Sequence, residues 1–295
     1  MRLRALAPGK VNLGLVLGPV RADGRHELVT AIESVSLADE LTLSTGPEIT
    51  ADQVECAAVD GRNLVEDALA ALRSAGWSAS PVRIEITKRI PVAGGMAGGS
   101  ADAAAALRMA LVLGDVRRGE VSRIAASLGS DVPSQLVPGL VLATGGGEVI
   151  EPREPLGDHA LVLLPLGSTL PAADVYARAD ALGLPLIDGE LRSRGRELGR
   201  AMKRGARLGP EQLVNDLDRA AISLQPEVAE ALRAARDVGA EHVFGSGSGP
   251  TVAGLFWGED GVARAGAAAR MLVDDYPDAV CVEPVGPDFG MPHPL

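Results

Sequence analysis

Apolar and polar positions along the first quarter of the chain follow the pattern of β-strands. Four apolar, β-compatible runs are separated by Pro8-Gly9, by a polar turn at residues 21–26 and by a short polar break. The predicted strands are residues 3–7, 11–20, 28–37 and 40–44. From Asn63 to Ala75 the apolar positions recur on one helical face, and Gly76 follows as a stop. Residues 82–86 alternate again as a half-buried strand.

Helices and strands are mixed in the remainder without regular strand–helix–strand alternation. Helices are predicted at residues 100–113, 118–128, 172–182, 190–204, 226–238 and 260–273. Strands are predicted at residues 139–143, 160–164, 242–246, 251–256 and 279–282, and the tail from residue 284 is predicted to be irregular. This order favours an α+β fold over a doubly wound sheet.

A chain of 295 residues is too long for one ordinary core and suits two domains. Pro152 and Pro155 punctuate a polar stretch after the first half. We therefore expect an N-terminal domain at residues 1–153 and a C-terminal domain at residues 154–295.

Charge and composition exclude several classes of partner. A net charge of −11 lacks the basic footprint that nucleic acid requires. The N-terminus shows no signal peptide, and no apolar run reaches the roughly 18 residues of a membrane span. Cys56 and Cys281 lie far apart and form no zinc motif. We expect a cytoplasmic protein with a small-molecule partner.

Lysine is scarce in this chain. Among the 28 basic residues, only Lys10, Lys88 and Lys203 are lysines. A lysine kept against such a bias supplies a compact point charge that arginine cannot imitate. Lys10 and Lys88 adjoin glycine-containing segments, which favours function, although a turn cation and a strand-end cation are the plain alternatives. Lys203, in an Arg-rich helix, is best read as chance.

A glycine-rich loop at residues 91–99 is the strongest chemical signal. Gly94, Gly95, Gly98 and Gly99 allow backbone N–H groups to converge on a phosphate, and Ser100 is the predicted N-cap of an Ala-rich helix. A helix N-terminus attracts anions. The loop is neither a Walker A loop nor G-x-G-x-x-G, and its alternative is a flexible turn before a buried helix.

This loop resembles the second motif of the GHMP kinases. Ala7-Pro-Gly-Lys-Val-Asn-Leu13 is similar to their first motif, and Phe244-Gly-Ser-Gly-Ser-Gly-Pro-Thr251 is similar to their third. Arg21-Ala-Asp-Gly-Arg-His-Glu-Leu28 and Leu128-Gly-Ser-Asp-Val-Pro133 resemble the diphosphocytidyl-methylerythritol kinase branch. The resemblance implies a two-domain GHMP kinase fold, with an N-terminal domain like ribosomal protein S5 domain 2 and a ferredoxin-like C-terminal domain. It implies ATP-dependent phosphorylation of the 2-hydroxyl of 4-diphosphocytidyl-2-C-methylerythritol, in non-mevalonate isoprenoid biosynthesis.

The resemblance also implies residue roles. Asp131 would accept the hydroxyl proton, and Lys10 would stabilise Asp131 and the accepting oxygen as charge develops. The implied ATP-binding residues are Asn63, Lys88, Pro91, Val92, Ala93, Gly94, Gly95, Met96, Ala97, Gly98, Gly99, Ser100 and Ala101. The implied substrate-binding residues are Asn12, Arg25, His26, Tyr176, Gly245, Ser246 and Gly247. Mg²⁺ is implied as a cofactor, with Ser100 as a ligand.

Several of these residues have structural alternatives. Asp131 and His26 also suit turns, Asn63 suits a helix N-cap, and the third motif suits a tight hairpin. Arg25 stands where the family usually has an aromatic residue that stacks on cytosine. A guanidinium can stack in the same way, so Arg25 and Tyr176 are predicted to sandwich the base. In the alternative, Arg25 points to solvent or pairs with an acidic neighbour such as Glu27, and Tyr176 holds cytosine alone.

Two other functions remain open at this point. The chain could be another GHMP kinase, of the homoserine or mevalonate kinase type, with a different alcohol substrate. It could also be a catalytically inactive nucleotide-binding regulator, although the joint presence of Lys10 and Asp131 disfavours that reading. We expect a monomer or a weak homodimer.

Overall fold

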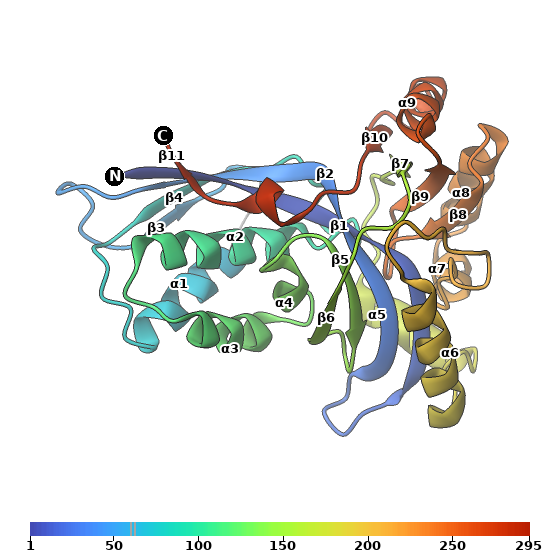
Figure 1. The fold of residues 1–295 in the computed structure, drawn as a ribbon, viewed down its shortest axis with the longest axis horizontal. Helices are drawn as coiled ribbons and strands as arrows, with labels where there is room; N and C mark the ends of the chain where they lie inside the picture. The colour runs from blue at the N-terminus through green and yellow to red at the C-terminus, as the bar shows by residue number, and fades with distance from the viewer. Residues whose placement is uncertain (60, 62) are drawn as a thin grey trace.

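Two long antiparallel strands, β1 (Arg2–Val20) and β2 (His26–Ser44), run through the whole fold. They belong to a computed structural model that describes residues 1–59, 61 and 63–295. The four predicted runs merge into these two strands, so the expected break at Pro8-Gly9 is wrong. A register shift between Pro8 and Lys10 takes up the irregularity, because a bulge tolerates a residue that has no N–H. Figure 1 shows both strands curving from the helical layer to the second sheet.

The N-terminal sheet has the order β11-β1-β2-β4-β3, and the hairpin of β5 and β6 joins it through β2. The added strands are β3 (Gln53–Glu55), β4 (Arg83–Thr87), β5 (Leu140–Thr144), β6 (Val149–Arg153) and β11 (His293–Pro294). The strands β3, β6 and β11 were not predicted from the sequence. β3 and β11 are too short to show a pattern, and β6 contains Pro152, which an edge strand tolerates.

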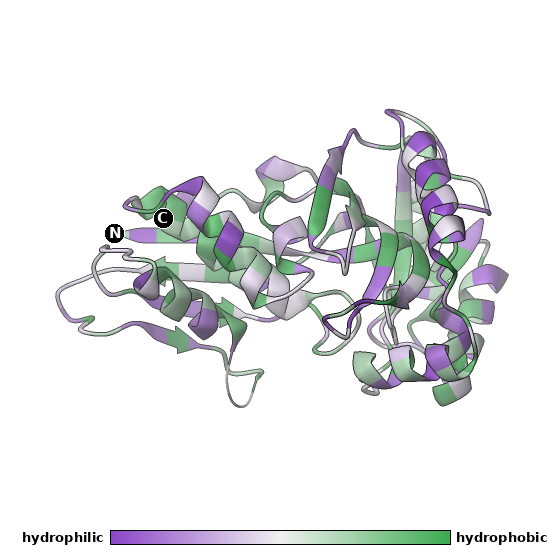
Figure 2. Ribbon diagram, turned by 90° about the horizontal axis from the view of Figure 1, so that it is seen from below, coloured by the Kyte–Doolittle hydropathy of each residue, from purple (hydrophilic) through white to green (hydrophobic). Residues whose placement is uncertain are grey.

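Four helices cover this sheet: α1 (Leu64–Ser74), α2 (Gly98–Leu113), α3 (Arg118–Leu128) and α4 (Val132–Gln135). The short α4 was not predicted. Every residue of α2 from Ala101 to Ala110 is buried, between the sheet on one side and α1 and α3 on the other. Apart from Asp102 and Arg108, this stretch is apolar all round, which is typical of a helix inside a core, and its alanines permit close approach. In Figure 2 the peripheral helices instead show mixed hydrophilic and hydrophobic turns.

The C-terminal sheet is antiparallel with the order β10-β7-β9-β8. Its strands are β7 (His159–Leu164), β8 (His242–Gly245), β9 (Val252–Trp257) and β10 (Val280–Val282). The helices of this half are α5 (Ala172–Ala181), α6 (Asp188–Ala201), α7 (Asp218–Leu224), α8 (Glu227–Asp237) and α9 (Gly261–Leu272), of which α7 was not predicted. With α8 and α9 packed on the sheet, this is the ferredoxin-like arrangement expected.

The other face of the second sheet packs on β1 and β2. Val11, Leu13 and Val29 share a buried cluster with Leu161 and Leu163 of β7. The two halves therefore share one hydrophobic contact surface. Among the described residues, no helix is long and apolar enough to cross a bilayer.

The C-terminal tail, predicted to be irregular, returns to the first sheet. The 3₁₀ helix η1 (Pro287–Gly290) precedes β11, which pairs with β1, and both chain ends lie together in Figure 1. The buried Arg108 of α2 donates hydrogen bonds to the carbonyls of Leu6, Gln135 and Gly290, at 2.8, 2.5 and 2.9 Å. The domain division at residue 153 stays a prediction, but the last residues lie on the N-terminal sheet.

A buried ion pair also joins the two sheets. His159 of β7 lies 2.8 Å from the carboxylate of Glu33 on β2, and the two side chains are 2% and 3% exposed. Burial, the largest single effect, opposes the imidazolium. The hydrogen bond and charge of Glu33, with the carbonyl of Gly157 and the charge of Asp158, together outweigh it and raise the pKa of His159 above 6.5. The charged pair therefore stabilises the contact between the halves.

We predict that His159→Gln removes one component of the pH dependence of stability. Because the folded pKa is raised, the His159 contribution is complete below the unfolded pKa and is lost as pH rises through the folded pKa. The difference in unfolding free energy between wild type and the variant should shrink as the pH rises above about 6.5, the ordinary pKa of histidine. Urea unfolding measures it, and parallel pH curves for the two proteins would contradict the assignment.

Candidate functional site

A cavity of about 600 Å³ opens between the start of α2, the middle of β1 and the loop after β8. This volume is in the range of small-molecule sites. Most of the residues singled out from the sequence line it: Lys10, Asn12, Asn63, Lys88, Pro91, Val92, Ala93, Gly94, Gly95, Ala97, Gly98, Gly99, Ser100, Asp131, Tyr176 and Gly247. The tertiary fold thus brings the three glycine-containing segments to one place.

The helix after the glycine-rich loop starts earlier than predicted. It begins at Gly98, and its N-cap is Ala97 in the left-handed region, with no side-chain capping bond, so Ser100 is not the N-cap. The first intrahelical bond runs from the N–H of Ala101 to the carbonyl of Ala97. The N–H groups of Gly98, Gly99 and Ser100 come before it and have no carbonyl one turn back to bind. They form the cradle that a phosphate fits.

Position 95 requires a glycine, because the second and third motifs are in contact there. Its φ is +76°, and a Cβ would lie 2.4 Å from the carbonyl oxygen of Ser246 and 2.7 Å from that of Gly249. Ala93 and Ala97 also have positive φ, at 57° and 56°. Such strain in non-glycine residues is typical of ligand loops. The loop is therefore held in a single shape by the neighbouring backbone.

Two residues predicted to bind ATP point away from the cavity. The side chains of Met96 and Ala101 are fully buried in the two hydrophobic cores. Met96 contributes its carbonyl, which accepts the backbone N–H of Lys10 at 3.1 Å. Their side-chain roles are structural, because alternate positions of a tight loop must face the core.

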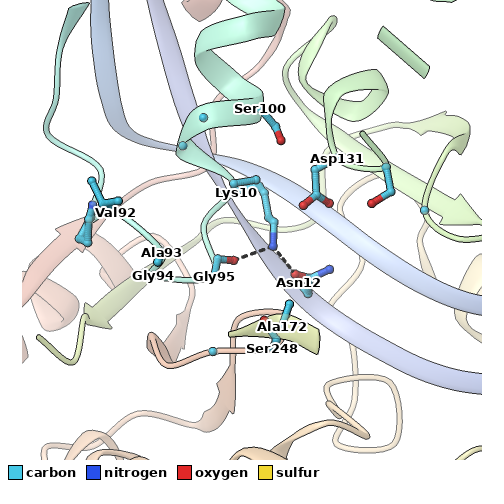
Figure 3. A pocket seen from close by; sticks show the side chains of 18 of the residues that line it. Lys10, Asn12, Val92, Ala93, Gly94, Gly95, Ser100, Asp131, Ala172 and Ser248 are labelled. Atoms are coloured by element: carbon cyan, nitrogen blue, oxygen red, sulfur yellow. Dashed lines mark hydrogen bonds between the residues drawn. The ribbon is translucent and has the colours of Figure 1, made fainter. Parts of the chain in front are cut away.

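Lys10 crosses from β1 to the phosphate loop. Its ammonium donates to the Asn12 side-chain oxygen at 2.8 Å and to the carbonyl of Gly95 at 2.6 Å. Burial lowers the pKa of Lys10, and the negative charge of Asp131 acts in the opposite direction. Asn12 is fixed in turn by its bond to the Thr30 hydroxyl at 2.8 Å. Figure 3 shows the Asp131 carboxylate directed toward the ammonium of Lys10.

Asp131 does not behave as a capping residue. It precedes α4 with helical backbone angles, and its carboxylate makes no capping bond within the described chain. It lines the cavity, where burial and the charge of Asp131 together raise the pKa of Tyr176 to about 12. The carboxylate therefore faces the interior between Lys10 and Tyr176.

Lys88 is held by two carboxylates. Its ammonium is 2.5 Å from Asp39 and 2.8 Å from Asp102, and all three side chains are nearly buried. Burial opposes the charge on Lys88, but Asp102 and Asp39 raise its pKa on balance. Sequence reasoning missed both carboxylates. The sequence did offer a signal for Asp102, which is the one charged residue in a run of alanines. A charge buried in such a helix requires a partner, so a buried cation could have been predicted beside it.

Asn63 has both of the roles that the sequence allowed. Its side chain caps α1 by accepting the N–H of Val65, and Glu66 completes a capping box. It also lines the cavity. The cap fixes the residue at the cavity wall.

The third motif contributes fewer free donors than expected. The N–H of Gly245 is bound by Asp218, and that of Ser246 by the carbonyl of Thr251. Gly247, with Ser248 and Gly249, lines the cavity instead.

Asn215 supports this third motif from behind. It donates to the carbonyls of Gly245 and Gly247 at 2.9 and 2.8 Å. Burial raises the pKa of Asp218, which binds the Gly245 N–H, to about 7. Both residues were missed by sequence reasoning. The only sequence signal for these two residues was the segment Asn215-Asp-Leu-Asp218, which leads into the start of α7.

Arg25 and Tyr176, predicted to sandwich the base, do not face each other in this structure. The guanidinium of Arg25 is about half exposed and pairs with Asp23 at 2.9 Å and Glu148 at 3.7 Å. This is the alternative in which Arg25 pairs with acidic neighbours, with Asp23 and Glu148 in the place of Glu27. Local carboxylates in the turn hold a flexible guanidinium more readily than a distant ring does.

His26 takes the place beside Tyr176. The two rings stack with centroids 5.3 Å apart and planes 22° apart. His26 is buried, with Nδ1 bonded to the Gly18 carbonyl at 2.9 Å and Nε2 3.4 Å from Asp180. It supports the aromatic wall from behind and does not itself line the cavity.

We predict opposite outcomes for alanine at two neighbouring glycines. Gly95→Ala should lower the unfolding free energy by at least about 2 kcal/mol, because positive φ and the clash with the third motif add together. Gly99→Ala meets no atom within 4 Å and should leave stability unchanged or slightly raised in a helix. Denaturant unfolding of both variants measures the contrast, and equal stabilities would contradict the packing argument.

Comparisons with known proteins agree with this geometry. The chain matches the GHMP kinases N terminal domain over residues 63–139 and the GHMP kinases C terminal family over residues 186–272. It is 39% identical to a 4-diphosphocytidyl-2-C-methyl-D-erythritol kinase of Thermobifida fusca, covering 89% of this chain and 90% of that one. It is 43% identical to that of Nocardia farcinica, covering 84% and 83%.

A solved 4-(cytidine 5'-diphospho)-2C-methyl-D-erythritol kinase superposes with a TM-score of 0.73 at 31% identity, covering 96% of this chain and 99% of that one. The expected two-domain kinase fold is thereby confirmed. From its sequence and its fold, the chain belongs to the 4-diphosphocytidyl-2-C-methyl-D-erythritol kinase family of GHMP kinases.

Proposed function

We propose that this protein transfers the γ-phosphoryl group of ATP to the 2-hydroxyl of 4-diphosphocytidyl-2-C-methyl-D-erythritol, in non-mevalonate isoprenoid precursor biosynthesis in the cytoplasm. The observation that carries the proposal is the placement of Lys10 and Asp131 opposite the open N-terminus of α2 in one cavity. The names of the relatives supply the identity of the acceptor.

The chemistry divides between the two ends of the cavity. The hydroxyl oxygen of the acceptor forms a bond to the γ-phosphorus while the bond to the β–γ bridging oxygen breaks and ADP leaves. Asp131 accepts the hydroxyl proton. Lys10, already oriented by Asn12 and Gly95, stabilises the negative charge near the accepting oxygen. The N–H groups at the start of α2 hold the phosphates.

Mg²⁺ fits this arrangement only as a partner of the nucleotide. Among the described residues, no group of three or more His, Cys, Asp or Glu side chains could hold a metal. Mg²⁺ favours a few protein oxygens together with the phosphates of its nucleotide, and Ser100 lines the cavity in the first turn of α2. When bound, the ion neutralises phosphate charge, and we propose the Ser100 hydroxyl as its protein ligand.

The substrate end of the cavity suits a flat, uncharged ring. Tyr176, backed by His26, forms one wall, and Leu170 and Pro171 lie beside it. A nucleobase packs flat against such an aromatic wall, whereas the short chains of homoserine and mevalonate have no ring to stack on it. This favours a cytidyl-diphosphate acceptor over other GHMP kinase substrates. We propose a monomer or a weak homodimer, with no nucleic acid or membrane partner.

We predict that Asp131→Asn lowers kcat by about 10²–10⁴-fold, the usual contribution of a general base, while the KM for ATP changes little. Asparagine keeps the shape of the side chain and loses the proton acceptor. The exposed Asp278→Asn is the matched control and should keep wild-type turnover. A coupled ADP-release assay measures both. A near-normal kcat in Asp131→Asn would show that Asp131 is not the general base. The argument that Lys10 and Asp131 together disfavour an inactive regulator would then fail as well.

We predict that Tyr176→Ala raises the KM for the cytidyl substrate about tenfold or more, because stacking on one base contributes roughly 1–3 kcal/mol. Tyr176→Phe should retain most of the affinity, and His26→Ala should lose part of it. Arg25→Ala should behave like wild type, because Asp23 and Glu148 already hold this side chain. An Arg25→Ala defect equal to that of Tyr176→Ala would restore the sandwich. Normal KM in all four variants would point to a different acceptor.

A further inference from the structure

A second hollow lies between α6 and two β-hairpins, away from the kinase cavity. Its volume is about 920 Å³, and it is bounded by α6, the tip of the β1–β2 hairpin and the β5–β6 hairpin. It shares no lining residue with the kinase cavity within the described chain. We call it the α6 groove. Its residues include Arg21, Val29, Leu142, Arg153, Leu191, Arg192, Arg196 and Arg200.

The rim of the α6 groove is rich in guanidinium groups. Arg192, Arg196 and Arg200 are spaced four residues apart, so they form one stripe along α6. Arg21 and Arg153 approach the groove from the turn after β1 and from β6. Five arginines at one hollow are notable in a chain whose net charge is −11.

The carboxylates at the rim neutralise only part of this charge. Asp188 lies 3.7 Å from Arg192, Glu151 lies 2.9 Å from Arg153, and Glu27 lies 3.8 Å from Arg21. Glu148 also binds Arg21, at 2.7 Å.

Two of the five arginines remain available. Arg196 and Arg200 have no ion pair within the described chain, and the Nε of Arg153 is buried without a hydrogen-bond partner. Asp23 also lies 3.5 Å from Arg21, so the rim carboxylates gather on the other arginines. The groove therefore keeps unmatched guanidinium donors at Arg196, Arg200 and the Nε of Arg153.

The floor of the groove is apolar. Val29, Leu142 and Leu191 are almost fully buried there. Glycines let α6 approach this floor closely: a Cβ on Gly195 would lie 3.0 Å from Val29, and one on Gly199 would lie 3.1 Å from Leu142. Gly199 also leaves room for the guanidinium of Arg153, which a Cβ would meet at 3.4 Å. Pro19 and the exposed Val20 continue this apolar floor at the hairpin tip, where it is open to the groove. An open apolar surface beside a cationic rim matches an amphiphilic anion.

We propose that the α6 groove binds a phosphate or diphosphate ester that carries a short apolar group. The guanidinium groups of Arg196, Arg200 and Arg153 bind the phosphate oxygens, since their planar donors match that geometry. The apolar group lies against Pro19 and the exposed Val20, where the apolar floor is open. The volume suits one small molecule, and the acidic chain around the groove excludes nucleic acid. This proposal is independent of the reaction proposed for the kinase cavity.

Isothermal titration calorimetry with n-hexyl diphosphate tests the proposal on the full chain. Adenylyl imidodiphosphate and cytidine diphosphate, both saturating, occupy the kinase cavity so that only a second site is observed. We expect one binding event, and an affinity at least about tenfold weaker in Arg196→Ala/Arg200→Ala, since this variant loses two charged hydrogen-bond donors. Inorganic pyrophosphate should bind more weakly than the hexyl ester.

The matched control is Arg233→Ala/Arg236→Ala on α8, which removes the same charge from another exposed helix surface. It should bind n-hexyl diphosphate like wild type. No binding by wild type, or equal weakening in both double variants, would overturn the site. Equal affinity for pyrophosphate and the hexyl ester would overturn the role of the apolar floor. Binding of an acidic peptide in preference to both probes would overturn the ligand class.

Discussion

The hydrogen bond from the Lys10 ammonium to the carbonyl of Gly95 joins residues 85 positions apart, and the kinase cavity depends on it. It ties the middle of β1 to the phosphate loop. Burying an ammonium is costly, and Asn12, Gly95 and the nearby charge of Asp131 offset part of that cost, while burial still lowers the pKa of Lys10. Because Gly95 is in turn pressed against the backbone of Ser246 and Gly249, the same contact sets the third motif. One cation thus orients all three glycine-containing segments.

Buried charge elsewhere in the fold follows the same logic. Lys88 holds Asp39 and Asp102 beneath the phosphate loop, and His159 holds Glu33 between the two sheets. Each pair connects elements that are far apart in the sequence. Removing one partner would leave an uncompensated charge in an apolar environment, which is strongly destabilising. The charges therefore specify how the layers meet more than they add to net stability.

The site also shows how a helix N-terminus is kept available for a ligand. A Ser cap on α2 would have satisfied an N–H group that a phosphate needs. Ala97 in the left-handed region starts the helix without using those donors. At the opposite wall, His26 keeps the Tyr176 ring in place without occupying the cavity. Preorganised donors and walls of this kind lower the cost of ordering a ligand.

Local patterns in the sequence determined the helices and strands that carry strong periodicity, the α+β class, and the three glycine-containing segments. They also indicated Lys10 through the scarcity of lysine, whereas Asp131 was indicated only by the resemblance of its segment to the GHMP kinases. The merging of four runs into β1 and β2, the return of the tail to β1, and the pairing of Lys88 with Asp39 and Asp102 depend on contacts between distant residues. The partners of Arg25 and Tyr176 were decided in the same way, since two rings or two charges meet only where the folded backbone brings them. A sequence pattern records which side chain is present, whereas its partner is fixed by the packing of layers in three dimensions.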